Sequence, residues 1–122
     1  VLLAPEWAGR APLRAQLIEE GFEVVAVDTW ESARPQLRPG MKPGLVIVDL
    51  HGLENPETVL DDLRILMKPS RVLVVTALGT LPPAQVEGLG FHVLRRPVSV
   101  GNIVASVRSL LGPRGGLTNK ES

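Results

Sequence analysis

The chain contains no cysteine and no tyrosine, and aromatic residues make up only 3% of its 122 residues. Without cysteine, the chain has no disulfides, no thiol catalysis and no cysteine-ligated zinc. The scarcity of aromatic side chains predicts an aliphatic core. Lysine plus arginine equals aspartate plus glutamate at 13 each. This balance gives no overall positive field to attract nucleic acid or an anionic membrane.

Long apolar runs are also missing, because none approaches the roughly 20 residues of a membrane span. The sequence begins directly with apolar residues, without methionine or a charged leader. We therefore expect an excised piece of a longer protein rather than a protein with a signal peptide. The expected location is cytoplasmic. The Walker loop, the Gly-x-Gly-x-x-Gly loop, the His-Glu-x-x-His motif and the Gly-x-Ser-x-Gly motif are all absent.

The residues that are present alternate between short apolar runs and amphipathic helical patterns. A hydrophobic fraction of 44% and a charged fraction of 21% are typical of one globular domain. The apolar runs are rich in valine and lack polar alternation, which predicts strands buried on both faces. The predicted strands are Val1–Ala4, Phe22–Val27, Leu45–Asp49, Val72–Thr76 and Phe91–Leu94.

Five helical patterns lie between and after these strands. The second should be short or kinked, because Pro35 lies too deep in it. The third should begin at Asn55, an N-cap residue followed by proline at the first helical position. The fourth is brief and contains Gly88. The predicted helices are Ala11–Glu20, Trp30–Leu37, the segment after Asn55, Pro82–Leu89 and the segment from Ser99 to Leu111.

Strict alternation of strands and helices predicts parallel strands joined by right-handed crossovers. The expected fold class is therefore α/β, a three-layer sandwich with helices on both faces of one sheet. We expect one domain over residues 1–112. Residues 113–122 are polar and glycine-rich, and we expect a flexible tail or linker there.

Polar side chains occur where four of the predicted strands end. They are Glu6, Asp49, Thr76 and the pair Arg95 and Arg96. Open α/β sheets bind ligands at the carboxyl ends of their strands, so these groups converge if the four strands are neighbours. Such a group of residues can handle a phosphoryl group, with Asp49 as nucleophile, Thr76 as hydrogen-bond donor and Arg96 as the neutralising cation.

Each of these residues also has a plainer interpretation. Asp49 can simply cap the turn after its strand. Thr76 is of a type common in strands, the arginines can be a solvated strand end, and Glu6 can be a surface acid near the first helix. His51 is interpreted either as a metal or proton-transfer group or as a solvent-facing loop residue.

The order and spacing of these residues resemble the receiver domain of two-component response regulators, across about residues 1–111. The matching segments are Leu45–Asp49, Val74–Ala77 and Val93–Pro97. They correspond to the phospho-accepting strand, the switch Thr-Ala pair and the strand that carries a Lys-Pro pair. The resemblance implies a flavodoxin-like, doubly wound (βα)5 sheet with strand order 2-1-3-4-5. It also implies Asp49 as phosphoacceptor, Thr76 as switch hydroxyl and Arg96 in place of the usual lysine.

The sequence departs from the family after the first strand, where two acids usually hold Mg²⁺. The matching dipeptide is Pro5-Glu6, so one carboxylate is missing. The ligands that the resemblance implies are Glu6, Asp49 and the backbone carbonyl of His51, and we expect them to bind Mg²⁺ only weakly.

The cation and the aromatic switch position also depart from the family. Arginine is always charged and its planar fork matches a carboxylate, so we expect Arg96 to pair with Asp49. The aromatic switch position is Val93, and Phe91 nearby has the same side-chain parity.

We therefore expect a receiver domain that accepts a phosphoryl group on Asp49 and relays the signal by a conformational change. Its expected partners are a histidine kinase or phosphotransfer protein and an output domain beyond the C-terminus. Neither enzymatic activity nor direct binding to nucleic acid or membrane is expected. The alternative is a phosphorylation-independent receiver-like interaction module. A flavodoxin-like ligand binder or enzyme ranks last, because Ala4–Trp7 offers no loop that cradles phosphate.

Overall fold

The computed structural model describes residues 1–5, 10–37, 44–77 and 79–111. It contains a five-stranded sheet in the order β2-β1-β3-β4-β5, and every neighbouring pair is parallel. Both the parallel sheet and the order 2-1-3-4-5 agree with the expectation. The strands are Leu2–Leu3 (β1), Ala26–Val27 (β2), Val46–Asp49 (β3), Val72–Thr76 (β4) and His92–Arg95 (β5).

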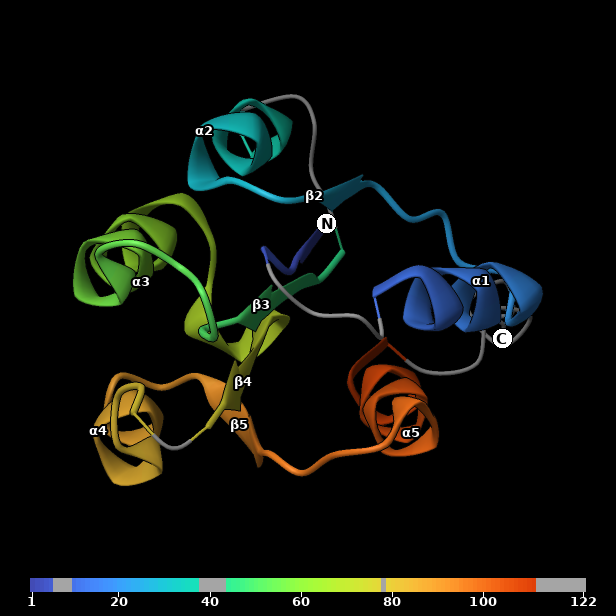
Figure 1. The fold of residues 1–122 in the computed structure, drawn as a ribbon. Helices are drawn as coiled ribbons and strands as arrows, with labels where there is room; N and C mark the ends of the chain where they lie inside the picture. Colours follow the sequence, from blue (N-terminus) through green and yellow to red (C-terminus); the bar gives the residue numbers. More distant parts are fainter. Residues whose placement is uncertain (6–9, 38–43, 78, 112–122) are drawn as a thin grey trace.

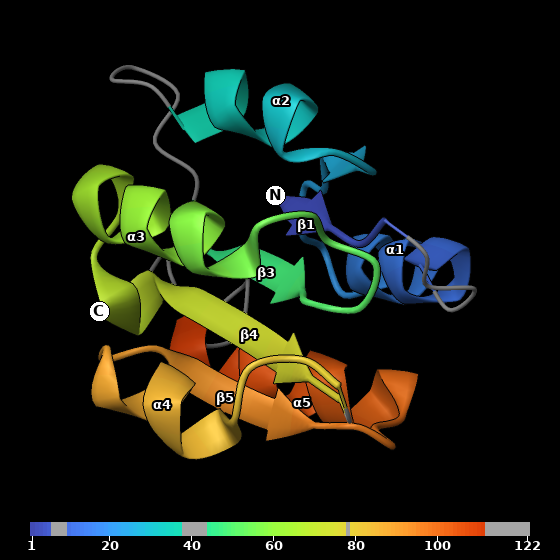
Figure 2. The same ribbon diagram turned by 60° about the vertical axis from the view of Figure 1, so that its left-hand side comes forward.

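Helices cover both faces of the sheet, as Figures 1 and 2 show. Helices α2, α3 and α4 lie on one face, and α1 and α5 lie together on the other (Figure 1). The α-helices are Arg10–Glu19 (α1), Trp30–Ala33 (α2), Pro56–Leu66 (α3), Pro83–Gly88 (α4) and Val100–Leu111 (α5). Because each helix follows a strand, the strand ends and the helix starts meet at one edge of the sheet, called here the carboxyl edge.

Two predicted strands are shorter than expected. Residues 1–4 and 22–27 were both predicted as strands, but the ladder covers only Leu2–Leu3 and Ala26–Val27. β2 is an edge strand that pairs with β1 alone. Phe22 and Val24 precede it and pack against the core without regular pairing. Their apolar character therefore reflects burial of side chains rather than membership of the ladder.

The second helix is interrupted, as predicted from Pro35. Helix α2 begins after Thr29, whose hydroxyl accepts a hydrogen bond from the backbone N–H of Ser32 at 3.1 Å. The chain then continues as a 3-10 helix over Arg34–Leu37. Proline lacks the N–H that a continuing α-helix needs, so the tighter turn follows from the sequence.

The start of α3 differs in one respect from the prediction. Asn55 is the N-cap residue and Pro56 follows at the first helical position, as expected. However, Asn55 has a left-handed backbone (φ 50°, ψ 56°), and its side chain makes no capping hydrogen bond. Asparagine tolerates this backbone better than most residues. The residue therefore suits the sharp turn into the helix rather than a side-chain cap.

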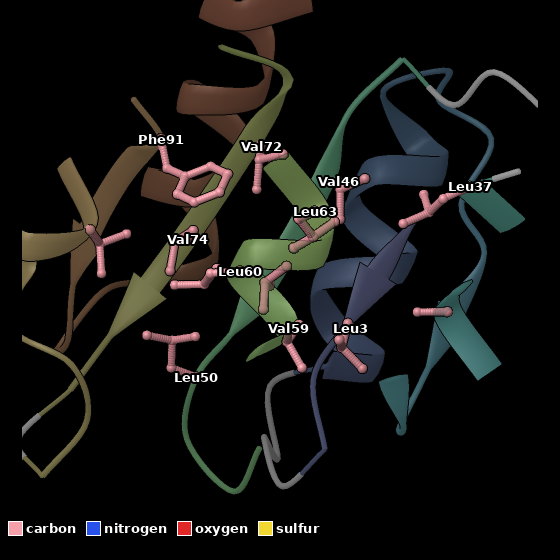
Figure 3. Close-up of a cluster of buried hydrophobic side chains, with 13 residues drawn as sticks. Leu3, Leu37, Val46, Leu50, Val59, Leu60, Leu63, Val72, Val74 and Phe91 are labelled. Atoms are coloured by element: carbon pink, nitrogen blue, oxygen red, sulfur yellow. The ribbon is translucent and has the colours of Figure 1, made fainter. Parts of the chain in front are cut away.

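The hydrophobic core consists of two clusters, one on each face of the sheet. Side chains along β3 point alternately to the two faces. Val46 and Val48 belong to the cluster under α2, α3 and α4, and Ile47 belongs to the cluster under α1 and α5. The first cluster is shown in Figure 3, where Leu60 and Leu63 of α3 lie against the sheet. All five residues of β4 are buried. The clusters anchor the central strands and so fix what stands at the carboxyl edge.

The predicted tail, residues 113–122, lies outside the described residues. Among the helices that the structure describes, none has the length and apolar character needed to cross a membrane.

Candidate functional site

The carboxyl edge of the sheet brings together residues that are far apart in the sequence. Pairing of β3 with β4 places Asp49 beside Val75, and pairing of β4 with β5 places Thr76 beside Arg95. The ladder continues one step further, because the backbone N–H of Arg96 donates to the Thr76 carbonyl at 2.8 Å. The polar residues predicted at the ends of β3, β4 and β5 therefore share one edge.

Strand alternation explains why Arg96, rather than Arg95, reaches Asp49. Asp49 follows Ile47 by two residues, so its side chain belongs to the face covered by α1 and α5. Leu94 packs in that same cluster, and Arg96 follows it by two residues. Arg95 has the opposite parity and is exposed. The expected contact between Arg96 and Asp49 thus follows from the register of the central strands.

Arg96 and Asp49 form an ion pair, as expected from the sequence. The guanidinium Nη2 of Arg96 donates to Oδ2 of Asp49. The Asp49 side chain is fully buried, and that of Arg96 is 22% exposed. The second carboxylate oxygen, Oδ1, accepts a hydrogen bond from the backbone N–H of His51 at 3.1 Å. A buried carboxylate needs a partner of this kind, since an isolated charge at the site would be costly.

Ala4 is the neighbour of Asp49 on the side of β1. Leu3 pairs with Val48, so the next residues, Ala4 and Asp49, stand side by side. Ala4 packs in the same cluster as Leu2 and is fully buried. Sequence reasoning compared only Pro5 and Glu6 with the acidic positions and missed Ala4. The register between β1 and β3 carries this information, and the spacing of residues along the chain does not.

The carboxyl edge, as far as it is described, does not fit Mg²⁺. Of the three expected ligands, Glu6 lies outside the described residues. His51 contacts Asp49 through its backbone N–H, and Asp49 already binds a cation, Arg96. Among the described residues no group of three histidine, cysteine, aspartate or glutamate side chains is placed to hold a metal. Mg²⁺ prefers several oxygen ligands in near-octahedral geometry, and Ala4 and Pro5 supply no side-chain oxygen.

Thr76 is buried at 2% exposure, and strand alternation places its side chain with Val72 and Val74 on the face opposite Asp49. The structure thus brings Asp49 and Arg96 into contact and links Thr76 to Arg96 through the backbone. Phe91 and Val93 both pack against the cluster on the Thr76 face, as their shared parity predicted.

Thr80 closes the loop that follows β4. Its hydroxyl donates to the Ala77 carbonyl at 2.7 Å and accepts from the Ala77 backbone N–H at 2.9 Å. These two bonds hold the residue directly after Thr76. Sequence reasoning missed Thr80, although threonine hydroxyls can hydrogen-bond to nearby backbone groups in turns.

A separate pocket of about 310 Å³ opens on the face of α2 and α3. It lies between the start of α2 and the loop that connects β3 to α3. Trp30, the first residue of α2, lines the pocket and also packs against the core. Trp7, the other tryptophan, lies outside the described residues. The residues that line the pocket do not include Asp49 or Arg96.

Solved structures share this architecture over nearly the whole chain. A signal receiver domain from Vibrio parahaemolyticus matches with a TM-score of 0.75 and 22% identity, covering 98% of this chain and 95% of that one. The receiver domain of NtrX from Brucella abortus matches with a TM-score of 0.74 and 18% identity, covering 90% of this chain and 95% of that one. Full-length FixJ from B. japonicum matches with a TM-score of 0.72 and 26% identity, covering 89% of this chain and 55% of that one.

Neither a protein-family model nor a curated protein matches the sequence. The structural matches and the strand order 2-1-3-4-5 nevertheless agree throughout the described sheet. The chain therefore has the fold of the receiver domains of response regulators.

Proposed function

We propose that the chain works as a receiver domain in signal transduction and that Asp49 is its phosphoacceptor. The observation that carries this proposal is the position of Asp49: a carboxylate at the carboxyl end of the central strand β3, in contact with Arg96, the residue directly after β5. The receiver fold of the structural matches supports it. The expected donor is a histidine kinase or phosphotransfer protein, and the expected receiver of the signal is an output domain elsewhere in the full protein.

The chemistry of the proposed step is a phosphoryl transfer. A carboxylate oxygen of Asp49 attacks phosphorus, the bond from phosphorus to the donor atom breaks, and its electron pair leaves with the donor. Arg96 first releases Oδ2 and then neutralises the oxygens of the transferring group. Thr76, the last residue of β4, serves as the switch hydroxyl once its side chain turns from the opposite face of the sheet toward the phosphoryl group. The need to break a buried ion pair makes the reaction slow. The domain acts as an acceptor and relay, without enzymatic activity of its own.

A second candidate is a receiver-like module that works without phosphorylation. The observation in its favour is that both oxygens of Asp49 already accept hydrogen bonds, from Arg96 and from His51. In that case the ion pair is a structural element of the carboxyl edge, and signals pass only through protein contacts.

Intact-mass spectrometry after incubation with acetyl phosphate and Mg²⁺ separates the two candidates. Under the proposed function, wild-type protein gains the mass of one phosphoryl group slowly, and Asp49→Asn gains none. Ser and Thr remain in both proteins, so the comparison isolates Asp49. If saturating donor produces no adduct while circular dichroism shows an intact fold, the phosphorylation-independent module replaces the proposed function.

A further inference from the structure

The negative charge of Asp49 is balanced by a positive charge in direct contact with it. One negative charge, on a fully buried carboxylate, meets one positive charge on Arg96, whose side chain is only 22% exposed. Charges in such surroundings are screened far less than exposed ones. The pair is therefore close to neutral, and the remaining oxygen is engaged by the backbone N–H of His51 at 3.1 Å.

On the side of the site toward β1, the described residues Ala4 and Pro5 add no charge and no ligand. Ala4 directly follows β1, one residue beyond the pair of Leu3 with Val48, which places it beside Asp49 on the same face, and it is fully buried. Its methyl group cannot coordinate a cation. The partly buried Pro5 that follows also lacks a side-chain oxygen. Beside Asp49, Ala4 supplies no charge, and Arg96 supplies the positive charge that balances the carboxylate.

Among the described residues a divalent cation has no favourable place beside Asp49. To reach Asp49 it would have to displace the guanidinium and leave two positive groups side by side in a poorly screened site. Mg²⁺ also loses its water shell reluctantly and usually requires one or two carboxylates that are free to bind it.

We propose that Arg96 takes the place of a divalent cation at Asp49. The site then binds neither Mg²⁺ nor Mn²⁺ at millimolar concentration, and a phosphoryl group is handled by the guanidinium alone. The second half of this proposal rests on the proposed function, and the first half stands without it. In the reaction with acetyl phosphate, the bond from Asp49 oxygen to phosphorus forms, and the bond from phosphorus to the acetyl oxygen breaks. Acetate leaves with the electron pair, and no co-reactant is needed.

The metal half is tested by titrating Mn²⁺ into ¹⁵N-labelled protein and following paramagnetic broadening of amide signals. Wild-type protein is expected to show no selective broadening of the signals of Asp49, His51 and Thr76. Arg96→Gln, which removes the competing charge, is expected to gain Mn²⁺ affinity by at least about tenfold. The exposed Arg95→Gln is the matched control and should behave like wild type.

Selective broadening of these signals in the wild type at millimolar Mn²⁺ would overturn the proposal, and this measurement needs no variant that folds poorly. If the broadening disappears in Glu6→Gln, a metal site that includes Glu6 is established instead. Arg96→Gln with unchanged affinity would also contradict a role for Arg96 in excluding the metal.

The phosphoryl half is tested by repeating the intact-mass experiment in EDTA. The rate at which the adduct forms is expected to stay within about twofold of the rate in Mg²⁺, since the cation is part of the chain. Loss of the adduct in EDTA alone would overturn the proposal. Absence of an adduct under both conditions would contradict the proposed function and this second half, and the Mn²⁺ titration would then decide the metal half.

Discussion

Replacing Arg96 by methionine is expected to lower the free energy of unfolding by about 3–5 kcal/mol. Methionine keeps much of the length of the side chain but removes the charge, so the fully buried Asp49 loses its ionic partner. One oxygen of the fully buried carboxylate would then be left without its ionic hydrogen-bond partner. The expected cost is that of stranding a buried charge, which exceeds the net contribution of the ion pair itself.

The control for this change is a second arginine in an ion pair at the surface. Arg108 of α5 pairs with Glu20, and its side chain is 53% exposed. Arg108→Met is expected to cost about 0–1 kcal/mol, because water and salt screen an exposed pair. Urea unfolding monitored by circular dichroism gives both values. Similar losses for the two variants would show that the burial of Asp49 has no special cost.

A double substitution tests whether Asp49 and Arg96 interact directly. Asp49→Asn combined with Arg96→Met removes both charges, so it should recover a large part of the stability lost in Arg96→Met alone. The difference between the double variant and the sum of the single variants measures the coupling between the two side chains. Additive losses would contradict a direct interaction.

A substitution in the buried face of helix α3 is expected to cause the second large loss of stability. Leu63 is fully buried against the sheet, where it is visible in Figure 3. Leu63→Ala is expected to lower the free energy of unfolding by about 2–5 kcal/mol, through lost burial and the cavity that remains. Ile65, two residues further on the same helix, is 83% exposed. Ile65→Ala should change stability by less than about 0.5 kcal/mol.

Urea unfolding of these two variants tests which face of α3 carries the core. The pair is matched, because both changes shorten an aliphatic side chain to alanine within one helix. If the two variants lose similar free energies of unfolding, or if Ile65→Ala loses more, then α3 does not pack against the sheet through the face that carries Leu63.

The sequence predicted the strands well where side chains are buried on both faces, and the strand order came from the resemblance to receiver domains. The central strands β3 and β4 consist almost entirely of buried Val, Leu and Ile, and this composition is visible without a structure. The edge strand β2 was overestimated, because Phe22 and Val24 are apolar for packing rather than for pairing. Local sequence does not distinguish these two causes.

The candidate site was predicted in part. The contact of Arg96 with Asp49 followed from charge and from the expected neighbours. The position of Ala4 beside Asp49 did not, since it depends on the register of two strands more than 40 residues apart in the chain. Thr80 was missed for a different reason. Its hydrogen bonds to Ala77 depend on how the loop turns, and threonine occurs in many loops without such a role.

The central claim is that a phosphoryl group on Asp49 changes the contacts of Arg96 and, through the backbone, those of Thr76. The most direct test compares ¹H–¹⁵N spectra of the ¹⁵N-labelled protein before and after incubation with acetyl phosphate. The account predicts that amide signals shift at Asp49, Arg96 and Thr76 and onward into the loop held by Thr80. These shifts should be absent in Asp49→Asn. Spectra that stay unchanged, or shifts that persist in Asp49→Asn, would contradict it.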